Sequence, residues 1–577
     1  MAVSITSPEA PEAVEKASPI VMGEDWRLFK PCFDDDGTTY ATLCGIANLP
    51  REAAIAELSR FSQDIKDETV NSLKAKVSST LLRDLLNMGW DVRASMHHIY
   101  VRPGQPLDPA ERKSLIRQQL LFGRNDQLCE ESNRRFLFGV ERPSKYSSCK
   151  PMTDLIADGR RLAEQLRPVA AAPKEERPEL LARICQPYLQ LVSEERDEFT
   201  NQRLIDIWRY FRHSWSTRYR SSPGRNLFYL VRDAAQPNHP VMGIAGLGNT
   251  VMQLTPRDAE LGWTLSGLLD ACSRGVVSET EVLRAFRLRL EDDFEQIYRE
   301  DLPVDRRIDH SVDDETVAKK FEELTPQRLQ ELTKTPLYRA KRARAAREIL
   351  RAYRTIATWP CGLHDLAATD HGAWALNTVL KQLKKRHSAT SMMELTVCGA
   401  VAPYNHLLAG KLVCLMMASP RVVNDYTDRY GGMVSVIASQ MAGRPITKEP
   451  HLAFLGTTSL YTDRSSQYNR VKLPYGKVEG QRAEIEFRQI GRTEGFGSPN
   501  LSVETEQGLA QIAEVVSGFR NVNFVFGEGQ SPKLRLLREG FAALGLNQTN
   551  LLQHGSQSRP RKSEHGVKWT GCSDGRG

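Results

Sequence analysis

The segment APYNHLLAGKLVCLMM, residues 402–417, places polar side chains inside the most apolar part of the chain. Strand-like residues precede it and helix-like residues end it, so we expect a turn that leads from a buried strand into a helix. Asn405, near the start of that helix, is placed to cap free backbone N–H groups, and Gly410 and Lys411 follow a turn and a half later. Because helix N-termini bind anions, Tyr404, Asn405, Gly410 and Lys411 form a candidate phosphate or ligand site.

A structural interpretation of the same turn stays open. In that interpretation Asn405 only caps the helix, and the stem of Lys411 lies along the apolar surface. The phosphate-binding sequence GxxxxGK[ST] is absent, so the motif does not decide between the two. Arg470, in the loop sequence SSQYNR, is added to the candidate site because arginine in a loop suits contact with phosphates.

A second set of candidate residues is basic. The stretch YRAKRARAAREILRAYR, residues 338–354, carries seven basic residues and one acid. On a helix, one stripe would hold Arg344, Arg347, Arg351 and Arg354. A basic stripe is expected where a helix lies on nucleic-acid phosphates, and Lys384 and Lys385 add a second basic cluster. The alternative is a solvated face that pairs with the acidic stretch at 291–315, and both interpretations stay open.

Other motifs predict no catalytic site. Arg257, Asp258 and Glu260 follow a strand pattern, but helix capping and an Arg–Asp ion pair explain them better than nuclease chemistry. The glycines of GIAGLGN, residues 243–249, lie inside a strand pattern and indicate close sheet packing rather than a dinucleotide site. HExxH, GxSxG and zinc-type Cys/His spacings are absent, so we predict no metal site, and the catalytic residues and cofactor stay unknown.

The elements that would position these residues indicate a mixed α/β (α+β) fold. Strand patterns are found at 224–233, 240–254, 393–401, 432–439, 451–462 and 483–493, and helical patterns at 506–519 and 531–546. The order strand, turn, helix, strand across 393–437 is typical of a βαβ crossover, which would place the turn with Tyr404 at the carboxyl edge of a sheet. An N-terminal hairpin is expected in DVRASMHHIYVRPG, residues 91–104.

The same patterns divide the chain into regions, with a mixed-sheet core that is interrupted by a long helical insertion. Pattern and composition predict a disordered tail (1–22), an N-terminal α/β region (23–150), a helical linker region (151–200), an α/β core domain (201–265 plus 389–552), a charged helical insertion (266–388) and a second disordered tail (553–577).

Composition narrows the class of protein. The chain has 577 residues and a formal net charge of +7, which is too small for this length to indicate nucleic-acid binding by itself. Ten cysteines without a CxxC pair suggest reduced thiols, and the N-terminus has no secretory signal, so a cytoplasmic location is expected. A membrane span across 395–419 is not expected, because Lys411 lies near its middle.

Several long motifs resemble a known family. They are DIWRYFRHSWS, PGRNLFYLVRDAAQPNHPVMGIAGLGN, RDAELGW, CGAVAPYNHLLAGKLVCLMMASPRVVNDYTDRYG, SSQYNRVKLP, GRTEGFGSPNLS and FGEGQSPKLRLLREG. Together, over about residues 26–554, they resemble the DruA family of the Druantia anti-phage defence systems. The resemblance implies a bacterial defence component that acts beside other Druantia components, including a large helicase-like protein. The family pattern ends in a short strand after LLQHG, which the pattern of 555–577 does not predict.

Three functions stay open. The favoured hypothesis is a defence component that engages DNA or RNA through the basic insertion. The second is an acyltransferase or another protein that binds CoA or a nucleotide, since the strand and helix order loosely resembles GNAT-type acetyltransferases, although their Q/RxxGxG/A motif is absent; whether the chain is an enzyme stays open. The third is a protein-interaction scaffold that uses an aromatic cluster, although aromatics at helical spacing are more often core. That cluster consists of Trp208, Tyr210, Phe211 and Trp215.

Overall fold

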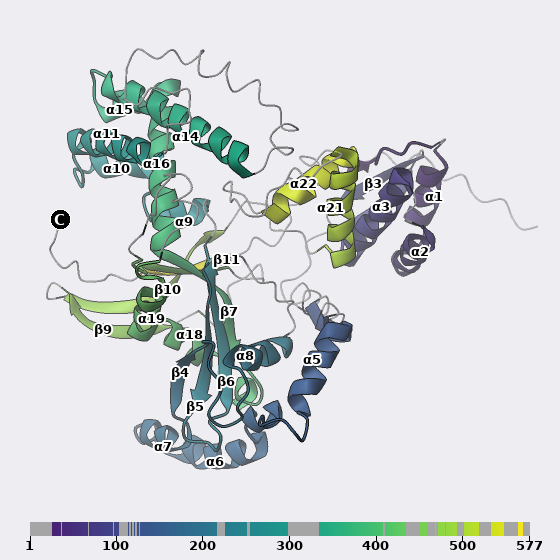
Figure 1. Cartoon of the computed structure of the whole chain (residues 1–577), viewed down its shortest axis with the longest axis vertical. Coiled ribbons are helices and arrows are strands. Elements are labelled where there is room, and N and C mark those ends of the chain that lie inside the picture. The colour runs from purple at the N-terminus through teal and green to yellow at the C-terminus, as the bar shows by residue number, and fades with distance from the viewer. Residues whose placement is uncertain are drawn as a thin grey trace, which may run out of the picture. The chain divides into compact units, whose positions relative to one another are not determined.

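The computed structural model places most of the chain (Figure 1). It describes residues 26–102, 127–215, 225–250, 254–297, 334–433, 450–458, 471–492, 501–517, 532–546 and 563–568. Within these ranges it leaves out residues 36, 67–68, 96, 408–409 and 479–480, and outside them it describes a few single positions such as Tyr468. The expected tail 1–22, Arg470 and residues 434–439 of the expected strand 432–439 lie outside the described residues.

The chain forms two compact units. Unit 1 consists of residues 1–106, 496–522 and 532–559, and unit 2 consists of residues 107–495, 523–531 and 560–577. This division differs from the regions expected from the sequence, which assigned everything from 389 to 552 to one core domain. Local patterns do not reveal which distant segments share a core, so the second and third segments of unit 1 were not expected there.

Unit 1 contains a three-stranded antiparallel sheet with helices on one face. The sheet order is β1 (Arg27–Phe29), β3 (His98–Arg102) and β2 (Asp91–Ser95), and β2 and β3 form the expected hairpin. The helices are α1 (Thr38–Ala47), α2 (Arg51–Asp64), α3 (Val70–Asn87), α21 (Val503–Ser517) and α22 (Pro532–Ala543). Phe29, Ile99 and Val101 point from the sheet into the core that these helices share.

The two C-terminal helices complete the core of unit 1. Leu509 is fully buried beside residues of α3, and Gly508 lies so close to Val77 that an added Cβ would meet its Cγ2 at 2.4 Å. The backbone N–H of Ser502 donates to Asp84 Oδ2 at 2.7 Å, which anchors the start of α21 to α3. Both helices form where the helical patterns at 506–519 and 531–546 predict them.

Unit 2 is built on an eight-stranded mixed sheet. Its order is β4 (Pro187–Leu191), β5 (Leu227–Asp233), β6 (Val241–Asn249), β7 (Met392–Ala400), β8 (Phe454–Thr458), β11 (Ser563–Lys568), β10 (Gln481–Arg492) and β9 (Lys472–Val478). Among these strands β7 and β8 pair in parallel, and the other neighbours are antiparallel. The expected fold class, a mixed-sheet core with a helical insertion, is confirmed.

Two strands correct the sequence analysis. β4 lies in 151–200, where the pattern predicts helix, because five residues at a sheet edge are too few to establish a strand period. β11 lies after LLQHG, where we predicted no strand. Its sequence, SEHGVK, has no apolar alternation, and pairing on both sides with β8 and β10 supplies the backbone hydrogen bonds that hold it in place.

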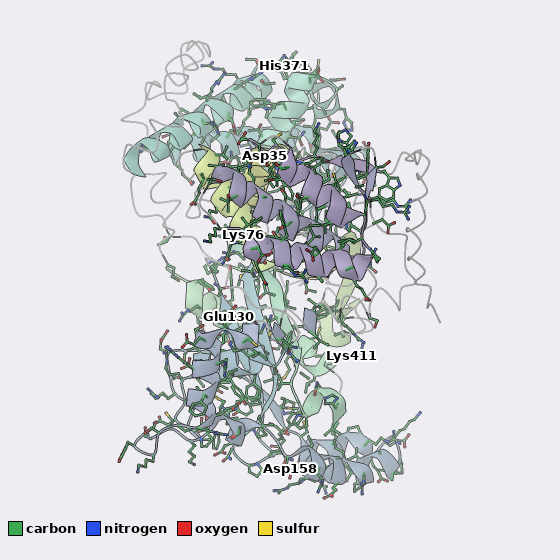
Figure 2. All side chains as sticks on the ribbon, turned by 90° about the vertical axis from the view of Figure 1, so that its right-hand side faces the viewer. Asp35, Lys76, Glu130, Asp158, His371 and Lys411 are labelled. Atoms are coloured by element: carbon green, nitrogen blue, oxygen red, sulfur yellow. The ribbon has the colours of Figure 1, made fainter. Side chains whose placement is uncertain are left out.

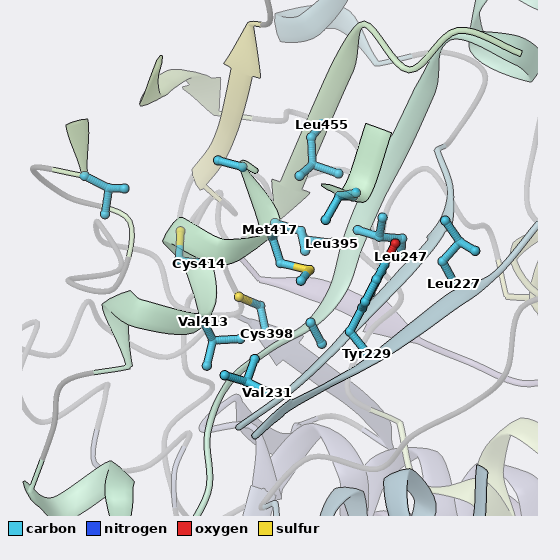
Figure 3. Close-up of a cluster of buried hydrophobic side chains, with 14 of the residues drawn as sticks. Leu227, Tyr229, Val231, Leu247, Leu395, Cys398, Val413, Cys414, Met417 and Leu455 are labelled. Atoms are coloured by element: carbon cyan, nitrogen blue, oxygen red, sulfur yellow. The ribbon is translucent and has the colours of Figure 1, made fainter. Parts of the chain in front are cut away.

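Helices cover both faces of the sheet of unit 2. On one face lie η1 (Met152–Leu155) and α8 (Leu204–His213), whose Trp208 and Phe211 are buried against Leu230 and Ile244. On the other lie α6 (Gly159–Ala171), α7 (Arg177–Ile184), α17 (Tyr404–Leu407), α18 (Lys411–Met417) and α19 (Pro420–Tyr430), whose core is shown in Figure 3. α5 (Glu131–Glu141) precedes η1.

The aromatic cluster of the scaffold hypothesis mainly serves this core. Trp208 Nε1 donates to the carbonyl oxygen of Ala245 at 2.9 Å, and Trp215 packs against Gly399. The glycines of β6 allow this packing, since a Cβ at Gly246 would meet Trp208 Cζ2 at 3.3 Å. The prediction that GIAGLGN serves close sheet packing is therefore confirmed.

The insertion between β6 and β7 is helical wherever the structure describes it. Its helices are α9 (Thr255–Glu260), α10 (Leu265–Ser273), α11 (Glu279–Glu295), α14 (Lys334–Ala357), α15 (Leu363–Ala367) and α16 (Asp370–Thr390). All of them except α9 share a separate apolar core, to which α11 contributes Phe294, α14 Ile349 and α16 Leu376. No helix among the described residues is long and apolar enough to cross a membrane.

Candidate functional site

Three arginines form an exposed stripe on α14. Arg344, Arg347 and Arg351 are exposed, whereas Ala346 and Ile349 on the other side of the helix are buried in the core of the insertion. The spacing of three and four residues follows the helix period, which places these three arginines opposite the buried Ala346 and Ile349. Arg354 is only partly exposed and does not extend the stripe fully. From here on, "the arginine stripe" means Arg344, Arg347 and Arg351.

Carboxylates do not neutralise the first two arginines of the stripe. Within the part of the chain that the structure describes, neither Arg344 nor Arg347 has a hydrogen-bond or ion-pair partner. The guanidinium carbon of Arg351 lies 4.7 Å from the centroid of the Trp374 ring, a cation–π contact that holds this side chain without cancelling its charge. Glu348, the one acid in this stretch, lies 3.9 Å from Lys381 Nζ.

The acidic residues of α11 are occupied elsewhere. Tyr353 Oη donates to Glu291 Oε1 at 2.8 Å, and Asp293 pairs with Arg289 of its own helix. Asp292 lies 3.9 Å from Arg386 Nη1. These acids therefore do not pair with the arginine stripe, and the rest of the acidic stretch, from Tyr298 on, lies outside the described residues.

Lys384 belongs to a different cluster from the stripe. Its Nζ lies 3.0 Å from Asp258 Oδ2, and the buried Asp258 also accepts from Arg257 Nη2 at 2.8 Å. The Arg257–Asp258 ion pair predicted from the sequence is confirmed, and with Lys384 it joins α9 to the end of α16. Lys385 is exposed and does not pair with Asp258, and Glu260 pairs with Arg488 of β10.

Tyr404 is a core side chain rather than an exposed residue of the turn. It is buried, and its hydroxyl donates to Asp233 Oδ2 at 2.8 Å, across the interface between α17 and the end of β5. Burial raises the pKa of Tyr404, so the hydroxyl stays protonated as the donor. We grouped Tyr404 with the polar residues of the turn because its hydrogen-bond partner, Asp233, lies far away along the chain.

The helix start also differs from the expectation. Tyr404–Leu407 forms a separate short helix, α17, and α18 begins at Lys411 with Gly410 as its N-cap. Asn405 is exposed, and α18 has no side-chain cap, so the predicted capping by Asn405 is wrong. Lys411 is therefore partly exposed in the first turn of α18 (Figure 2), rather than a turn and a half into a helix.

β7 and β8 pair at the start of β7, whereas this turn follows the end of β7. They pair only through Met392–Glu394 and Phe454–Gly456, although β7 continues to Ala400. Next to this point Thr396 is bulged out of the ladder with β6, and Thr457 Oγ1 donates to the carbonyl oxygen of Leu395 at 3.1 Å. β7 and α18 form as the predicted crossover requires, but most of its second strand, 432–439, lies outside the described residues, and the strand parallel to β7 is β8. Ligands commonly bind at the carboxyl end of a strand at such a junction.

Two buried thiols lie where α18 packs on β7, and the sequence analysis did not single them out. Cys398 of β7 and Cys414 of α18 lie in the core shown in Figure 3, near the buried Tyr468. Burial and the neighbouring Cys398 raise the pKa of the Cys414 thiol, and burial raises that of the Tyr468 hydroxyl. A protonated thiol is a poor nucleophile, so Cys414 is a core side chain.

The described residues can be searched for metal ligands. No group of three or more His, Cys, Asp or Glu residues among the described part of the chain is placed to hold a metal ion. The candidate residues thus fall into separate places: the arginine stripe on α14, the Lys384–Asp258 cluster, and the turn before α18. Among these places the stripe brings several exposed cations together on one helix face without carboxylate partners among the described residues.

Parts of the chain are similar to known proteins. The family model described as "Druantia protein DruA" matches residues 159–271 and 365–559, on either side of the segment that carries the arginine stripe. A curated relative, Druantia protein DruA of Escherichia coli (strain UMEA 4076-1), is 31% identical over 172 residues, which cover 29% of this chain and 37% of that protein. The match thus spans little more than a third of the relative, and no solved structure matches the chain. Because the family model covers more than half of the residues, the chain belongs to the DruA family.

Proposed function

We propose that the chain is a component of a Druantia-type anti-phage defence system and engages DNA or RNA through the insertion. The observation that carries the proposal is the arginine stripe, in which three guanidinium groups are exposed on one face of α14. Two of them have no carboxylate partner among the described residues. Family membership supports the defence role, and the stripe supports the kind of ligand.

The chemistry of the stripe fits the nucleic-acid backbone rather than the bases. Arginine on a regular helix face offers planar, permanently charged donors, which suit phosphate oxygens. Each phosphate contact releases condensed counterions and therefore weakens as salt rises. Backbone contacts fix orientation without reading sequence, so the stripe would bind many sequences with similar affinity.

The partners follow from the same proposal. The resemblance to Druantia systems implies other components, including a large helicase-like protein, and we place both on the same nucleic acid. The buried Trp208 and Phe211 are not available as a docking surface for such a protein, so the aromatic cluster does not support the scaffold function.

The test is a salt titration of nucleic-acid binding by fluorescence anisotropy. Replacement of Arg344, Arg347 and Arg351 by Gln should weaken binding of duplex and single strands alike. The slope of log K against log salt should fall by about one unit for each phosphate that the variant no longer neutralises. Glutamine preserves helix propensity, so the fold of α14 should be retained.

The matched control removes three arginines that already pair with carboxylates, and so removes the same positive charge away from the stripe. Arg60, Arg135 and Arg274 are exposed, and each pairs with a carboxylate on its own helix. Their triple replacement by Gln should leave the salt slope unchanged. Equal slopes for the two triple variants would show that only net charge matters and would contradict a role for the stripe.

A second candidate function is binding of CoA, as in an acyltransferase. The observation that favours it is the parallel pair β7–β8, which separates after three residue pairs and leads into α18. The order of β5, β6, β7, α18 and β8 agrees with the GNAT-type order considered from the sequence. A Cβ at Gly410 would meet Ala400 N at 3.7 Å, an ordinary contact, so Gly410→Leu adds bulk where a ligand would bind, and circular dichroism checks that the variant folds. Saturable acetyl-CoA binding that Gly410→Leu abolishes would support this candidate, and no thermal shift with any CoA compound would exclude it.

A further inference from the structure

The sheet of unit 1 has a second face, opposite its core. The register places Leu28, Tyr100 and Arg93 side by side on this face, and Arg102 and Asp91 in the next row. Their neighbours along the strands, including Phe29 and Ile99, point into the core instead. Alternation along the chain puts Trp26 on the outer face as well, beside Arg102.

The outer face is unusual for the solvated side of an antiparallel sheet. Such a side normally carries polar residues, whereas this one presents Trp26, Leu28 and Tyr100. Leu28 is 47% exposed, and Trp26 and Tyr100 are partly exposed. The face therefore offers two aromatic rings where solubility alone would favour polar side chains.

Arginines accompany the rings. The guanidinium carbon of Arg102 lies 4.5 Å from the centroid of the Trp26 ring, and that of Arg93 lies 5.9 Å from the same centroid. Both distances are in the range of cation–π contacts, which hold the guanidinium planes beside the indole.

The charge of this face is positive. Asp91 accepts from Arg102 Nε at 2.9 Å and lies 3.5 Å from Arg51 Nη2, so one carboxylate faces two guanidinium groups. Arg93 is exposed and has no carboxylate partner among the described residues. An anionic ligand with flat apolar groups would match the rings and the charge together.

We propose that this face of unit 1, consisting of Trp26, Leu28, Arg93, Tyr100 and Arg102, binds single-stranded nucleic acid. Unpaired bases stack on aromatic rings and on guanidinium planes, and the backbone phosphates pair with the free arginine. A duplex keeps its bases stacked on each other, so it cannot use the rings. The face therefore prefers single strands, whereas the arginine stripe of α14 acts on phosphates of either form.

The test uses the full-length chain and labelled oligothymidine, with a duplex of the same length as the comparison. The double variant Trp26→Thr/Tyr100→Thr removes both rings and keeps residue types that favour strands. The dissociation constant for the single strand should rise about tenfold or more, the effect expected when base stacking is removed. Binding of the duplex should not change, and Trp26→Phe/Tyr100→Phe should keep most of the single-strand affinity.

The matched control is Tyr146→Thr in unit 2. Tyr146 is 88% exposed, and Lys145 Nζ lies 5.3 Å from the centroid of its ring, so it also combines an aromatic ring with a cation. Its replacement should leave single-strand binding unchanged. Circular dichroism and urea unfolding of all variants separate loss of binding from loss of folding.

A second measurement locates the contact. Photo-crosslinking with a bromodeoxyuridine strand, followed by mass spectrometry, should yield adducts on peptides that contain Trp26 or Tyr100. Absence of single-strand binding, or unchanged affinity in a folded Thr double variant, would overturn the proposal, as would crosslinks confined to unit 2.

The two nucleic-acid proposals have separable outcomes. Removal of the arginine stripe should lower the salt slope for both forms, whereas removal of the rings should lower single-strand affinity with little change in slope. If only the ring variants matter, the function proposed for α14 fails and the inference for unit 1 stands. If only the stripe variants matter, the reverse holds.

Discussion

Tyr404 illustrates how a polar residue in an apolar turn can serve the core. Its hydroxyl is the donor for Asp233 Oδ2, and both side chains are buried. Tyr404→Phe should therefore lower the free energy of unfolding by about 1–3 kcal/mol, because a buried carboxylate oxygen loses its donor. Urea unfolding measures the change. The exposed Asn405, replaced by Ala, should change stability by less than about 0.5 kcal/mol. Reduced ligand binding in Tyr404→Phe without a loss of stability would contradict the structural role.

His213 gives the protein an acid-sensitive position. Burial, followed by the charges of Arg209 and Arg212, lowers the pKa of this imidazole from 6.5 to about 4. The unfolded chain therefore takes up the proton first as pH falls. The contribution of His213 to the free energy of unfolding should be constant above pH 6.5. Between pH 6.5 and about 4 it should fall, by at most about 1.4 kcal/mol per pH unit.

The variant His213→Gln should remove this part of the pH dependence. Urea unfolding of both proteins at neutral pH and at pH 5 provides the comparison, and the stability difference between them should shift in favour of the variant at the lower pH. A difference that does not vary with pH would show that the imidazole titrates alike in the folded and unfolded chains.

At the scale of elements, one glycine decides whether α18 can pack on the sheet. A Cβ at Gly243 of β6 would lie 2.4 Å from Val413 Cγ2 and 2.8 Å from the carbonyl oxygen of Gly399. Gly243→Ala should therefore destabilise unit 2 by about 1–3 kcal/mol, since α18 or β7 must move. Gly139 in α5 has open space around its Cβ position, so Gly139→Ala should stabilise by about 0.5–1 kcal/mol. Thermal unfolding of the two variants should therefore shift in opposite directions.

At the scale of the whole molecule, unit 1 depends on residues from both ends of the chain. Leu509 of α21 is fully buried in the core that α3 shares. Leu509→Ala should cost about 2–5 kcal/mol and should increase hydrogen exchange in α3, more than 400 residues earlier along the chain. Exchange in β5 and β6 should not change.

The reciprocal variant tests the division into units. Leu455 of β8 is fully buried in the core of unit 2. Leu455→Ala should increase exchange in β7 and leave α3 protected. A rise in exchange throughout the chain in either variant would mean that the two units unfold together.

Much of the fold was predictable because its signals are local. β5, β6 and β7 are continuous apolar runs, which indicate strands buried on both faces, and helices cover both faces of this sheet. The helical insertion, the β2–β3 hairpin and α21 and α22 follow from periodicity in the same way. The arginine stripe was also predictable, since residues three and four apart share one side of a helix.

Other features were decided only in the tertiary structure. β11 forms because β8 and β10 offer unpaired backbone on either side, although SEHGVK has no strand pattern. Tyr404 is a core residue because its hydroxyl donates to Asp233, and Lys384 forms an ion pair with Asp258 instead of lying on the predicted basic surface.

The outer face of unit 1 likewise needed the register of three strands before its residues could be recognised as one surface. By itself, the sequence determined the local elements and the family resemblance. The pairing of distant segments, and with it the burial or exposure of each candidate residue, required the folded chain. The physical reason is that burial and charge compensation depend on neighbours in space, and those neighbours lie far apart along the sequence.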